Sequence, residues 1–276
     1  MKLNFIKVNP SENMTVFIMD PVPRDKHVEI SNKIMNYNNI HAEQVGFVEK
    51  GTNNGQIRLQ MMGGEFCGNA SRALASILVL KKHSSVDHSN NKAIVPLEVS
   101  GTEDIHHLEV IPTESETTFI SSIEMPLHSN IEDICINYND YVYKASLITF
   151  SGIMHIIVDD ENIASKHDFF INAINTLEYL DYDALGIMFL NEEKSFITPL
   201  VYVKATDSIV WERSCGSGTA AVGIFLSYKN KKNIDAVITQ PGGELKIITK
   251  WENNAVTEAT LSGIVSIVAE GVLYLD

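Results

Sequence analysis

The stretch Phe66-Cys67-Gly68-Asn69-Ala70-Ser71 recurs in altered form as Ser214-Cys215-Gly216-Ser217-Gly218-Thr219, 148 residues further along the chain. One such match would be expected by chance. Three matches in the same order indicate a duplicated domain, and the spacing is far longer than the period of a solenoid repeat. The two other matches occur at an offset of 140 residues and pair 11–20 with 151–160 and 45–48 with 185–188.

The hydrophobic pattern predicts the same kinds of elements in both halves. Alanine-rich stretches of helical length follow both Cys-Gly pairs and run toward lysines, which favour a helix C-terminus. Short β-branched runs have the length of strands. We therefore expect an α+β chain. The predicted helices are 28–37, 70–82, 165–177 and 219–229, the predicted strands include 15–19, 155–158, 200–203 and 245–249, and 83–95 is predicted as a polar loop.

The repeat also predicts where the domains lie. With 276 residues, the chain is long enough for two modest domains or one large one. We expect an N-terminal domain at 1–122 and a C-terminal domain at 123–262. A strand at about 263–276 is a candidate to return to the first domain.

Composition excludes several classes of partner. The chain has 35 acidic and 21 basic residues, a net charge of −14 that repels a phosphate backbone, so nucleic acid is not expected. No apolar run is long enough for a membrane span, and the N-terminus has no signal-peptide core. Three widely spaced cysteines without a secretion signal suit a reducing compartment, so we expect a cytoplasmic protein. The sequence has no Cys-x-x-Cys motif and no pair of Cys and His residues at the spacing of zinc ligands, so we expect no metal site.

A cysteine next to a helix N-terminus is chemically unusual. The helix dipole and the exposed amides lower the pKa of the thiol, and an adjacent glycine lets the backbone approach a ligand. Successive amides in such a turn can hold a carboxylate. A single turn of this kind is more often plain packing. Two equivalent turns, at Cys67 and Cys215, would face each other across a cleft between the halves.

Two thiols on opposite sides of a cleft suit one reaction type. One can remove the Cα proton of an amino acid while the other delivers a proton to the opposite face, and the helix N-termini stabilise the charge that develops. The residues alone therefore predict an amino-acid racemase or epimerase that needs no pyridoxal phosphate. A cysteine hydrolase would leave the second turn unexplained, and disulfide oxidoreductases usually place their thiols close in sequence. A thiol redox enzyme and a non-catalytic amino-acid-binding protein stay open.

The motifs Glu65-Phe66-Cys67-Gly68-Asn69-Ala70 and 212–219 resemble the two active-site motifs of the diaminopimelate epimerase family of cofactor-independent racemases. The resemblance covers essentially the whole chain. It implies two pseudo-symmetric barrel-like domains, each a sheet around a central helix, with the active site in the cleft between them. It also implies that Cys67 and Cys215 transfer the protons and that no cofactor or metal takes part. The substrate-binding candidates are Asn13, Gln44, Gly68, Asn69, His155, Glu212, Gly216, Ser217, Gly218 and Thr219.

The departures from the family pattern concern the substrate side chain. Residues 59–64 replace a longer Asn-x-Asp-Gly-Ser stretch, and Ile153-Met154-His155 replaces Asn-Pro-His. The missing groups hold the distal ends of diaminopimelate, so their loss argues against that substrate. The pattern of 65–70 together with that of 211–219 is most similar to the histidine racemases of this family, some of which supply D-histidine for metallophore synthesis. We therefore expect a free amino acid, histidine first, with diaminopimelate or another amino acid as the alternative.

The remaining candidates have competing interpretations. Glu212 could bind the substrate ammonium or be an ordinary acid at a helix start, and His155 could hold a cysteine or a carboxylate or be a core residue. Cys135 is interpreted as packing, and His106-His107 as a solvated strand face. The turn 240–243 is expected to have no chemistry of its own. A homodimer is left open as an assembly state.

Overall fold

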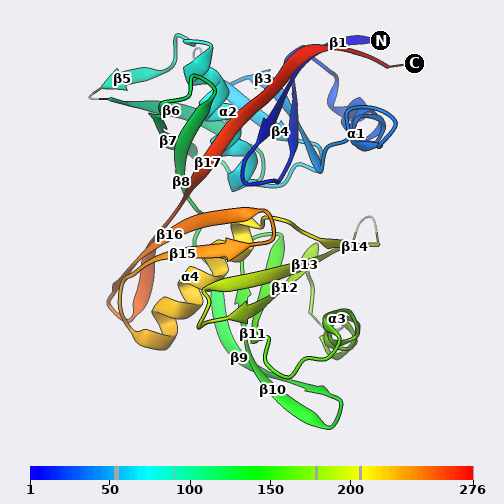
Figure 1. Ribbon diagram of the computed structural model, residues 1–276, viewed down its shortest axis with the longest axis vertical. Helices are drawn as coiled ribbons and strands as arrows, with labels where there is room; N and C mark the ends of the chain where they lie inside the picture. The colour runs from blue at the N-terminus through cyan, green and yellow to red at the C-terminus, as the bar shows by residue number, and fades with distance from the viewer. Residues whose placement is uncertain (53–55, 90, 178–179, 205–206, 276) are drawn as a thin grey trace. The chain divides into compact units, whose positions relative to one another are not determined.

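The computed structural model describes residues 1–52, 56–89, 91–177, 180–204 and 207–275. The chain divides into two compact units: the first is Met1–Glu124 with Ser262–Asp276, and the second is Met125–Leu261. The fold is a sheet-dominated α+β structure with few helices (Figure 1).

In the first unit, the described residues form eight N-terminal strands, three helical segments and the end of the last strand. Its elements are β1 (Lys2–Asn9), β2 (Thr15–Ile18), η1 (Arg24–Lys26), α1 (His27–Met35), β3 (Gln44–Lys50), β4 (Ile57–Met61), α2 (Gly68–Leu80), β5 (Asp87–Ser89), β6 (Lys92–Val99), β7 (Ile105–Pro112), β8 (Thr118–Glu124) and the later part of β17 (Ala255–Tyr274).

In the second unit, the described residues form the remaining strands and the helices α3 and α4. Its elements are β9 (Asn130–Tyr138), β10 (Tyr141–Thr149), β11 (Ile153–Asp159), α3 (Lys166–Thr176), β12 (Ala184–Asn191), β13 (Phe196–Val203), β14 (Ser208–Trp211), α4 (Gly216–Asn230), β15 (Ile234–Gln240), β16 (Gly243–Glu252) and the beginning of β17.

The two units repeat one pattern of strand pairing. In the first unit, β1–β2 is antiparallel, β2–β3 parallel, β3–β4 antiparallel, β4–β6 parallel and β6–β7 antiparallel. In the second unit, β10–β11, β11–β12, β12–β13, β13–β15 and β15–β16 follow the same alternation. A helix connects each parallel pair, as parallel strands require a crossover.

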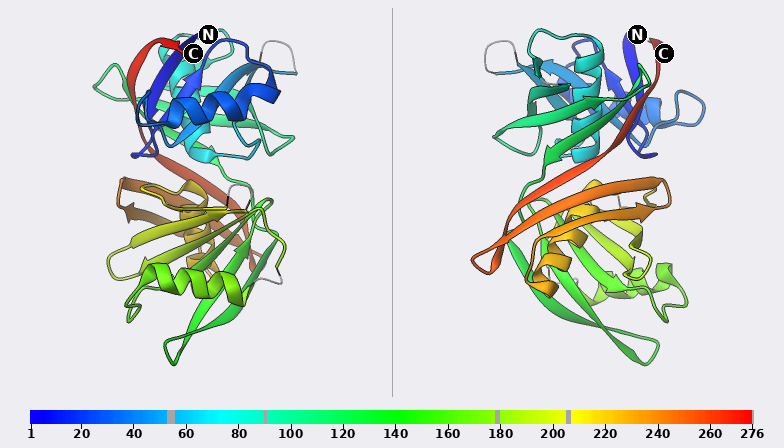
Figure 2. Two further views of the ribbon diagram at one scale, coloured as in Figure 1. Left: turned by 90° about the vertical axis from the view of Figure 1, so that its right-hand side faces the viewer. Right: turned by 60° about the vertical axis from the view of Figure 1, so that its left-hand side comes forward.

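Each unit has one enclosed helix and one outer helix. All residues of α2 from Gly68 to Val79 are buried, and α2 packs on β2, β6, β7 and β8. The apolar and small residues of α4 pack in the same way on β10, β11, β12, β15 and β16. Figure 2 shows α1 and α3 on the outside of their own unit's sheet. A helix enclosed by a sheet needs small and apolar residues on most of its surface, which explains the alanine-rich stretches after both cysteines.

Two sequence-based expectations need correction. The region 83–95 was expected to be a loop, but β5 and the beginning of β6 pair there as an antiparallel hairpin. The turn includes Asn91 with φ of 64°, so polar turn residues concealed two short strands. Strand register also changes one offset. Phe17 of β2 pairs with Gly46, and His155 of β11 pairs with Gly186. If the two glycines are equivalent, Phe17 corresponds to His155, which is an offset of 138 residues between β2 and β11.

Candidate active site

Cys67 and Cys215 occupy the same backbone position, immediately before an α-helix. The sulfur of Cys67 accepts a hydrogen bond from the backbone amide of Ala70 at 3.4 Å, and the sulfur of Cys215 accepts one from the backbone amide of Gly218 at 3.2 Å. Both cysteines have extended backbone angles, with ψ of 106° and 108°. A helix N-terminus and a backbone amide donor both favour the thiolate over the thiol. Each sulfur therefore lies where it can hold negative charge.

Side-chain amides link Cys67 to the first strands of its unit. Cys67 Sγ donates to Gln44 Oε1 at 3.4 Å. Gln44 Nε2 donates to Asn13 Oδ1 at 2.8 Å, and Asn69 Nδ2 donates to the same oxygen at 3.2 Å. Asn13 Nδ2 in turn donates to Glu43 Oε2 at 2.8 Å. Three predicted binding residues, Asn13, Gln44 and Asn69, therefore form one hydrogen-bonded cluster with the cysteine.

The turn at Ser100-Gly101 supports the segment that carries Cys67. Ser100 Oγ donates to the carbonyl of Glu65 at 2.7 Å. Gly101 has φ of +78°, and a Cβ at this position would lie 2.4 Å from the backbone nitrogen of Phe66. Glycine permits both this backbone angle and this close approach. The position of Cys67 thus depends on a turn about 35 residues away in sequence.

In the second unit, Gln240 fixes the backbone at Cys215. Gln240 Oε1 accepts a hydrogen bond from the backbone amide of Cys215 at 2.7 Å, and Gln240 Nε2 donates one to Thr219 Oγ1 at 2.9 Å. The Thr219 hydroxyl donates to the carbonyl of Cys215 at 2.7 Å. Gln240 is 2% exposed. The turn at 240–243 therefore supports the backbone at Cys215 through Gln240.

His155 lies close to Cys215 through a serine. His155 Nε2 is 3.0 Å from Ser217 Oγ, which is 3.7 Å from Cys215 Sγ. The ring is fully buried, and burial lowers its pKa to about 3, so the imidazole is neutral near neutral pH. A Cβ at Gly186 would lie 2.4 Å from His155 Nδ1, so the missing side chain makes room for the ring.

Cys215 is held as a thiol by its surroundings. Burial raises the pKa of Cys215 well above its usual range, and the charge of Glu212 and a hydrogen bond with its carboxylate raise it further. The amide of Gly218 and the hydroxyl of Ser217 act in the opposite direction. Glu212 precedes the helix outside it and interacts with the cysteine, so its role as a simple helix-start acid does not apply.

Met188 forms an apolar wall beside this turn. A Cβ at Gly218 would lie 2.2 Å from Met188 Sδ and 2.9 Å from Cys215 Sγ, and Met188 is fully buried. Gly68 and Gly216 are the first residues of α2 and α4, where backbone amides lack acceptors within the helix. Of the predicted binding residues, Gly68 lies beside Cys67, and His155, Glu212, Gly216, Ser217, Gly218 and Thr219 gather at Cys215.

Other sequence interpretations change with the structure. Cys135 is exposed on β9, so its interpretation as a packing residue was wrong. His106 is partly buried on β7, with its ring 5.3 Å from that of Phe66, so the His106-His107 pair is not simply a solvated face. Sequence reasoning missed Gln240 and Arg72. Arg72 is a fully buried arginine in α2 that donates to Asn69 Oδ1 at 2.7 Å.

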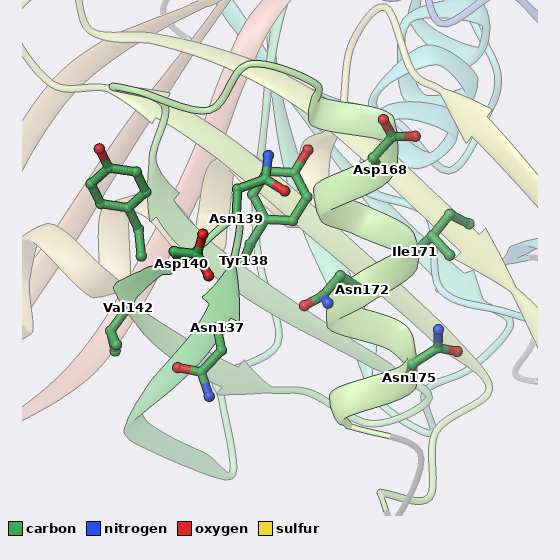
Figure 3. A pocket seen from close by; sticks show the side chains of 10 residues that line it. Asn137, Tyr138, Asn139, Asp140, Val142, Asp168, Ile171, Asn172 and Asn175 are labelled. Atoms are coloured by element: carbon green, nitrogen blue, oxygen red, sulfur yellow. The ribbon is translucent and has the colours of Figure 1, made fainter.

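A pocket in the second unit is formed by α3 and the β9–β10 hairpin, and Cys215 is not among its lining residues. Figure 3 shows its lining of amide, carboxylate and aromatic side chains, including Asn139, Asp140 and Asn172, and none of the predicted site residues is among them. Within the described ranges, no group of three or more His, Cys, Asp or Glu side chains is arranged to hold a metal ion. None of the described helices is long and apolar enough to span a membrane.

Comparisons with known proteins agree on one class of enzyme. A family profile described as the histidine racemase CntK N-terminal domain matches residues 2–274. A histidine racemase from Fusobacterium nucleatum subsp. nucleatum is 38% identical over 279 residues, covering 99% of this chain and 97% of that protein. A histidine racemase from Staphylococcus aureus is 27% identical, covering 99% of this chain and 98% of that protein.

Solved structures share the fold at low sequence identity. A hydroxyproline epimerase from Agrobacterium vitis, with bound trans-4-hydroxy-L-proline, superposes with a TM-score of 0.68 at 9% identity and covers 100% of this chain and 93% of its own. A predicted epimerase from Pseudomonas aeruginosa gives a TM-score of 0.67 at 9% identity, covering 99% of this chain and 100% of its own.

Proposed function

The chain belongs to the histidine racemase family, and from this premise we propose that it interconverts L- and D-histidine by proton transfer between Cα and two thiols. That it is an amino-acid racemase, an isomerase, follows from the family. One observation carries the mechanism: Cys67 and Cys215 are the only two cysteines of the chain that cap a helix through sulfur. Each unit supplies one of them.

The proposed reaction is a balanced exchange of protons. The thiolate of one cysteine takes the Cα proton, so an S–H bond forms as the C–H bond breaks and the electron pair stays on Cα. The other cysteine donates its thiol proton to the opposite face and becomes the thiolate. The two sulfurs have then exchanged protonation states, and proton exchange with water restores the starting form.

Backbone amides at the two helix starts supply the electrostatic stabilisation. The amides of Gly68 and Gly216 lie at the N-termini of α2 and α4, where they favour a carboxylate and the negative charge that builds up beside it. His155 is neutral and bonded to Ser217, so we assign it the role of orienting the hydroxyl next to Cys215. Glu212 is assigned the role of keeping Cys215 protonated until it donates.

The architecture behind this proposal is a duplicated domain. We propose 1–122 with 263–276 and 123–262 as the two domains, each a barrel-like sheet around its enclosed helix. The pairing of β17 with both β1 and β8 supports a closed sheet in the first unit. The expected cytoplasmic location and homodimeric assembly stay predictions.

A substrate panel tests the proposed function. L- and D-histidine, both diaminopimelate isomers and other amino acids are incubated with the enzyme under reductant, and enantiomers are separated by chiral chromatography. We expect histidine to racemise, and Cys67→Ser and Cys215→Ser each to lower the rate at least about a hundredfold, because each serine removes a proton-transfer group.

Cys135→Ser is the matched control, because this third cysteine is exposed and caps no helix. It should racemise histidine at the wild-type rate. Racemisation of diaminopimelate but not of histidine would reassign the substrate. Stoichiometric binding of histidine without racemisation would favour an amino-acid-binding protein, and consumption of reductant during turnover would favour a redox enzyme.

A further inference from the structure

Gln240, the last residue of β15, closes a ring of hydrogen bonds around Cys215. The backbone N–H of Cys215 donates to Gln240 Oε1 at 2.7 Å, and Gln240 Nε2 donates to Thr219 Oγ1 at 2.9 Å. The Thr219 hydroxyl donates in turn to the carbonyl of Cys215 at 2.7 Å. All three residues are buried. Because a backbone N–H can only donate, the oxygen of the Gln240 amide has to face Cys215 and its nitrogen has to face Thr219.

The ring leaves the backbone of Cys215 little freedom. Its N–H is held by Gln240, and its carbonyl accepts from both the amide and the hydroxyl of Thr219, at 3.0 and 2.7 Å. The side-chain torsion χ1 is held by the hydrogen bond from the Gly218 amide to the sulfur at 3.2 Å. Thr219 and Gly218 belong to α4 itself, whereas Gln240 reaches Cys215 from another element. The position of the sulfur relative to the sheet therefore depends on Gln240.

The turn after β15 also holds the residue two positions before the cysteine. The backbone N–H of Gly242 donates to the carbonyl of Arg213 at 2.7 Å. In the first unit, Ser100 follows β6, and its hydroxyl donates to the carbonyl of Glu65, which likewise lies two positions before Cys67. The strands β6 and β15 have the same place in the pairing order of their units. Both units thus support the segment before their cysteine from the end of the corresponding strand.

We propose that Gln240 is a positioning residue for racemisation, which holds the peptide group before Cys215 so that the sulfur is aligned with one face of Cα. The inference deepens the proposed function and rests on it for its catalytic consequence. Both polar groups of the Gln240 side chain are used inside the ring, so it acts through Cys215 and not on the substrate. A small displacement of the sulfur slows proton transfer at its own face of Cα, because the step depends steeply on alignment.

Amide exchange tests the hydrogen bond of Gln240 without relying on turnover. The chain has three cysteines, so full-length protein labelled with ¹⁵N-cysteine gives three backbone signals, which Cys67→Ser and Cys135→Ser assign. In the wild type we expect the Cys215 amide to exchange slowly with D₂O, because it is buried and hydrogen-bonded. Gln240→Met, an apolar replacement of similar length, should speed this exchange at least about tenfold and leave the other two cysteine signals unchanged.

Primary isotope effects test the catalytic consequence. L- and D-histidine with deuterium at Cα are compared with the unlabelled enantiomers, and the isotope effect on kcat/KM is measured from each direction. Slower transfer at Cys215 makes cleavage of the C–H bond that faces Cys215 more rate-limiting and cleavage of the bond that faces Cys67 less so. In Gln240→Met we expect racemisation to slow about tenfold or more, with an isotope effect that rises for one enantiomer and falls toward unity for the other.

Thr249→Val is the matched control. The hydroxyl of Thr249 on β16 is hydrogen-bonded to that of Ser227 near the other end of α4, and both residues are fully buried. The substitution therefore removes a buried polar contact of the same helix without touching the ring around Cys215. It should lower the free energy of unfolding, because Ser227 loses its partner, and should leave the Cys215 amide exchange and both isotope effects unchanged.

The outcomes separate the inference from the proposed function. A Cys215 amide that exchanges freely in the wild type overturns the inference, even if Gln240→Met fails to fold. Unchanged Cys215 exchange, or unchanged isotope effects, in a folded Gln240→Met overturn it as well. Faster Cys215 exchange in a variant of a protein that racemises no amino acid supports the hold of Gln240 on Cys215 and rejects the proposed function alone.

Discussion

At the residue scale, Cys67 and Cys215 have the same backbone surroundings but different side-chain neighbours. Both sulfurs accept an amide from three residues on. Cys67 is partly exposed and has Arg72 further along its helix, whereas Cys215 is buried beside Glu212. The proposed proton transfer needs one base and one acid at a time, so the two cysteines need not have the same surroundings.

The burial of His155 predicts a pH dependence of stability. Its folded pKa is about 3, below the ordinary value of 6.5, so between these values the unfolded chain binds a proton that the folded protein does not. This contribution to the free energy of unfolding is fully present above about pH 6.5 and is lost as the pH falls toward 3, by about 1.4 kcal/mol per pH unit. Urea denaturation at a series of pH values measures this slope.

His155→Gln is the informative variant, because glutamine cannot take up the proton and can still bond Ser217. We expect a shallower loss of stability with acid in this variant than in the wild type. Equal slopes in the two proteins would show that the buried imidazole does not carry this acid sensitivity.

At the element scale, the start of α4 depends on the absence of a side chain at Gly218. Gly218→Ala would place a Cβ against Met188 Sδ and Cys215 Sγ, at 2.2 and 2.9 Å. We expect a loss of stability of about 1–3 kcal/mol from overpacking. We also expect the racemisation rate to fall at least about tenfold, because a displaced sulfur no longer lines up with Cα.

Gly223→Ala in the same helix is the control for that variant. Its Cβ would lie 2.5 Å from Ile247 Cγ1, so it overpacks α4 against β16 away from the sulfur. It should lose comparable stability and keep its racemisation rate. Equal losses of rate in both variants, measured at equal folded fraction, would mean that Gly218 matters only for packing.

The sequence predicts elements better than it predicts their partners. The helices after Cys67 and Cys215 could be predicted because alanine-rich apolar stretches are long and lie next to a repeated motif. The β5–β6 hairpin could not, because β5 is three residues long and fully exposed, so it shows no apolar alternation. Arg72 and Gln240 were missed because a charged or amide side chain in sequence gives no signal of burial.

At the scale of the whole molecule, the order of strand pairing repeats in the two units, and short motifs of the sequence repeat as well. The antiparallel and parallel pairings of the strands follow one another in the same order in both units. The motif repeat predicted this, and the return of the C-terminal strand to β1 is seen over Lys2–Asn9. The substrate side chain could be predicted only by resemblance, because a pocket for it depends on residues from many elements.

The central claim is that two thiols act on one Cα, and isotope placement tests it most directly. L-histidine is incubated with the enzyme in D₂O under reductant, and the Cα position of each enantiomer is followed at low conversion by NMR and chiral separation. Two bases give the new enantiomer a deuteron from the second thiol, while a proton taken by the first thiol can return only to the starting face.

We therefore predict deuterium in D-histidine and protium in the remaining L-histidine, with the mirror result when D-histidine is the substrate. Cys67→Ser and Cys215→Ser should both abolish product formation. Deuterium appearing in the remaining L-histidine as fast as in D-histidine, or racemisation that survives either substitution, would contradict the two-thiol mechanism.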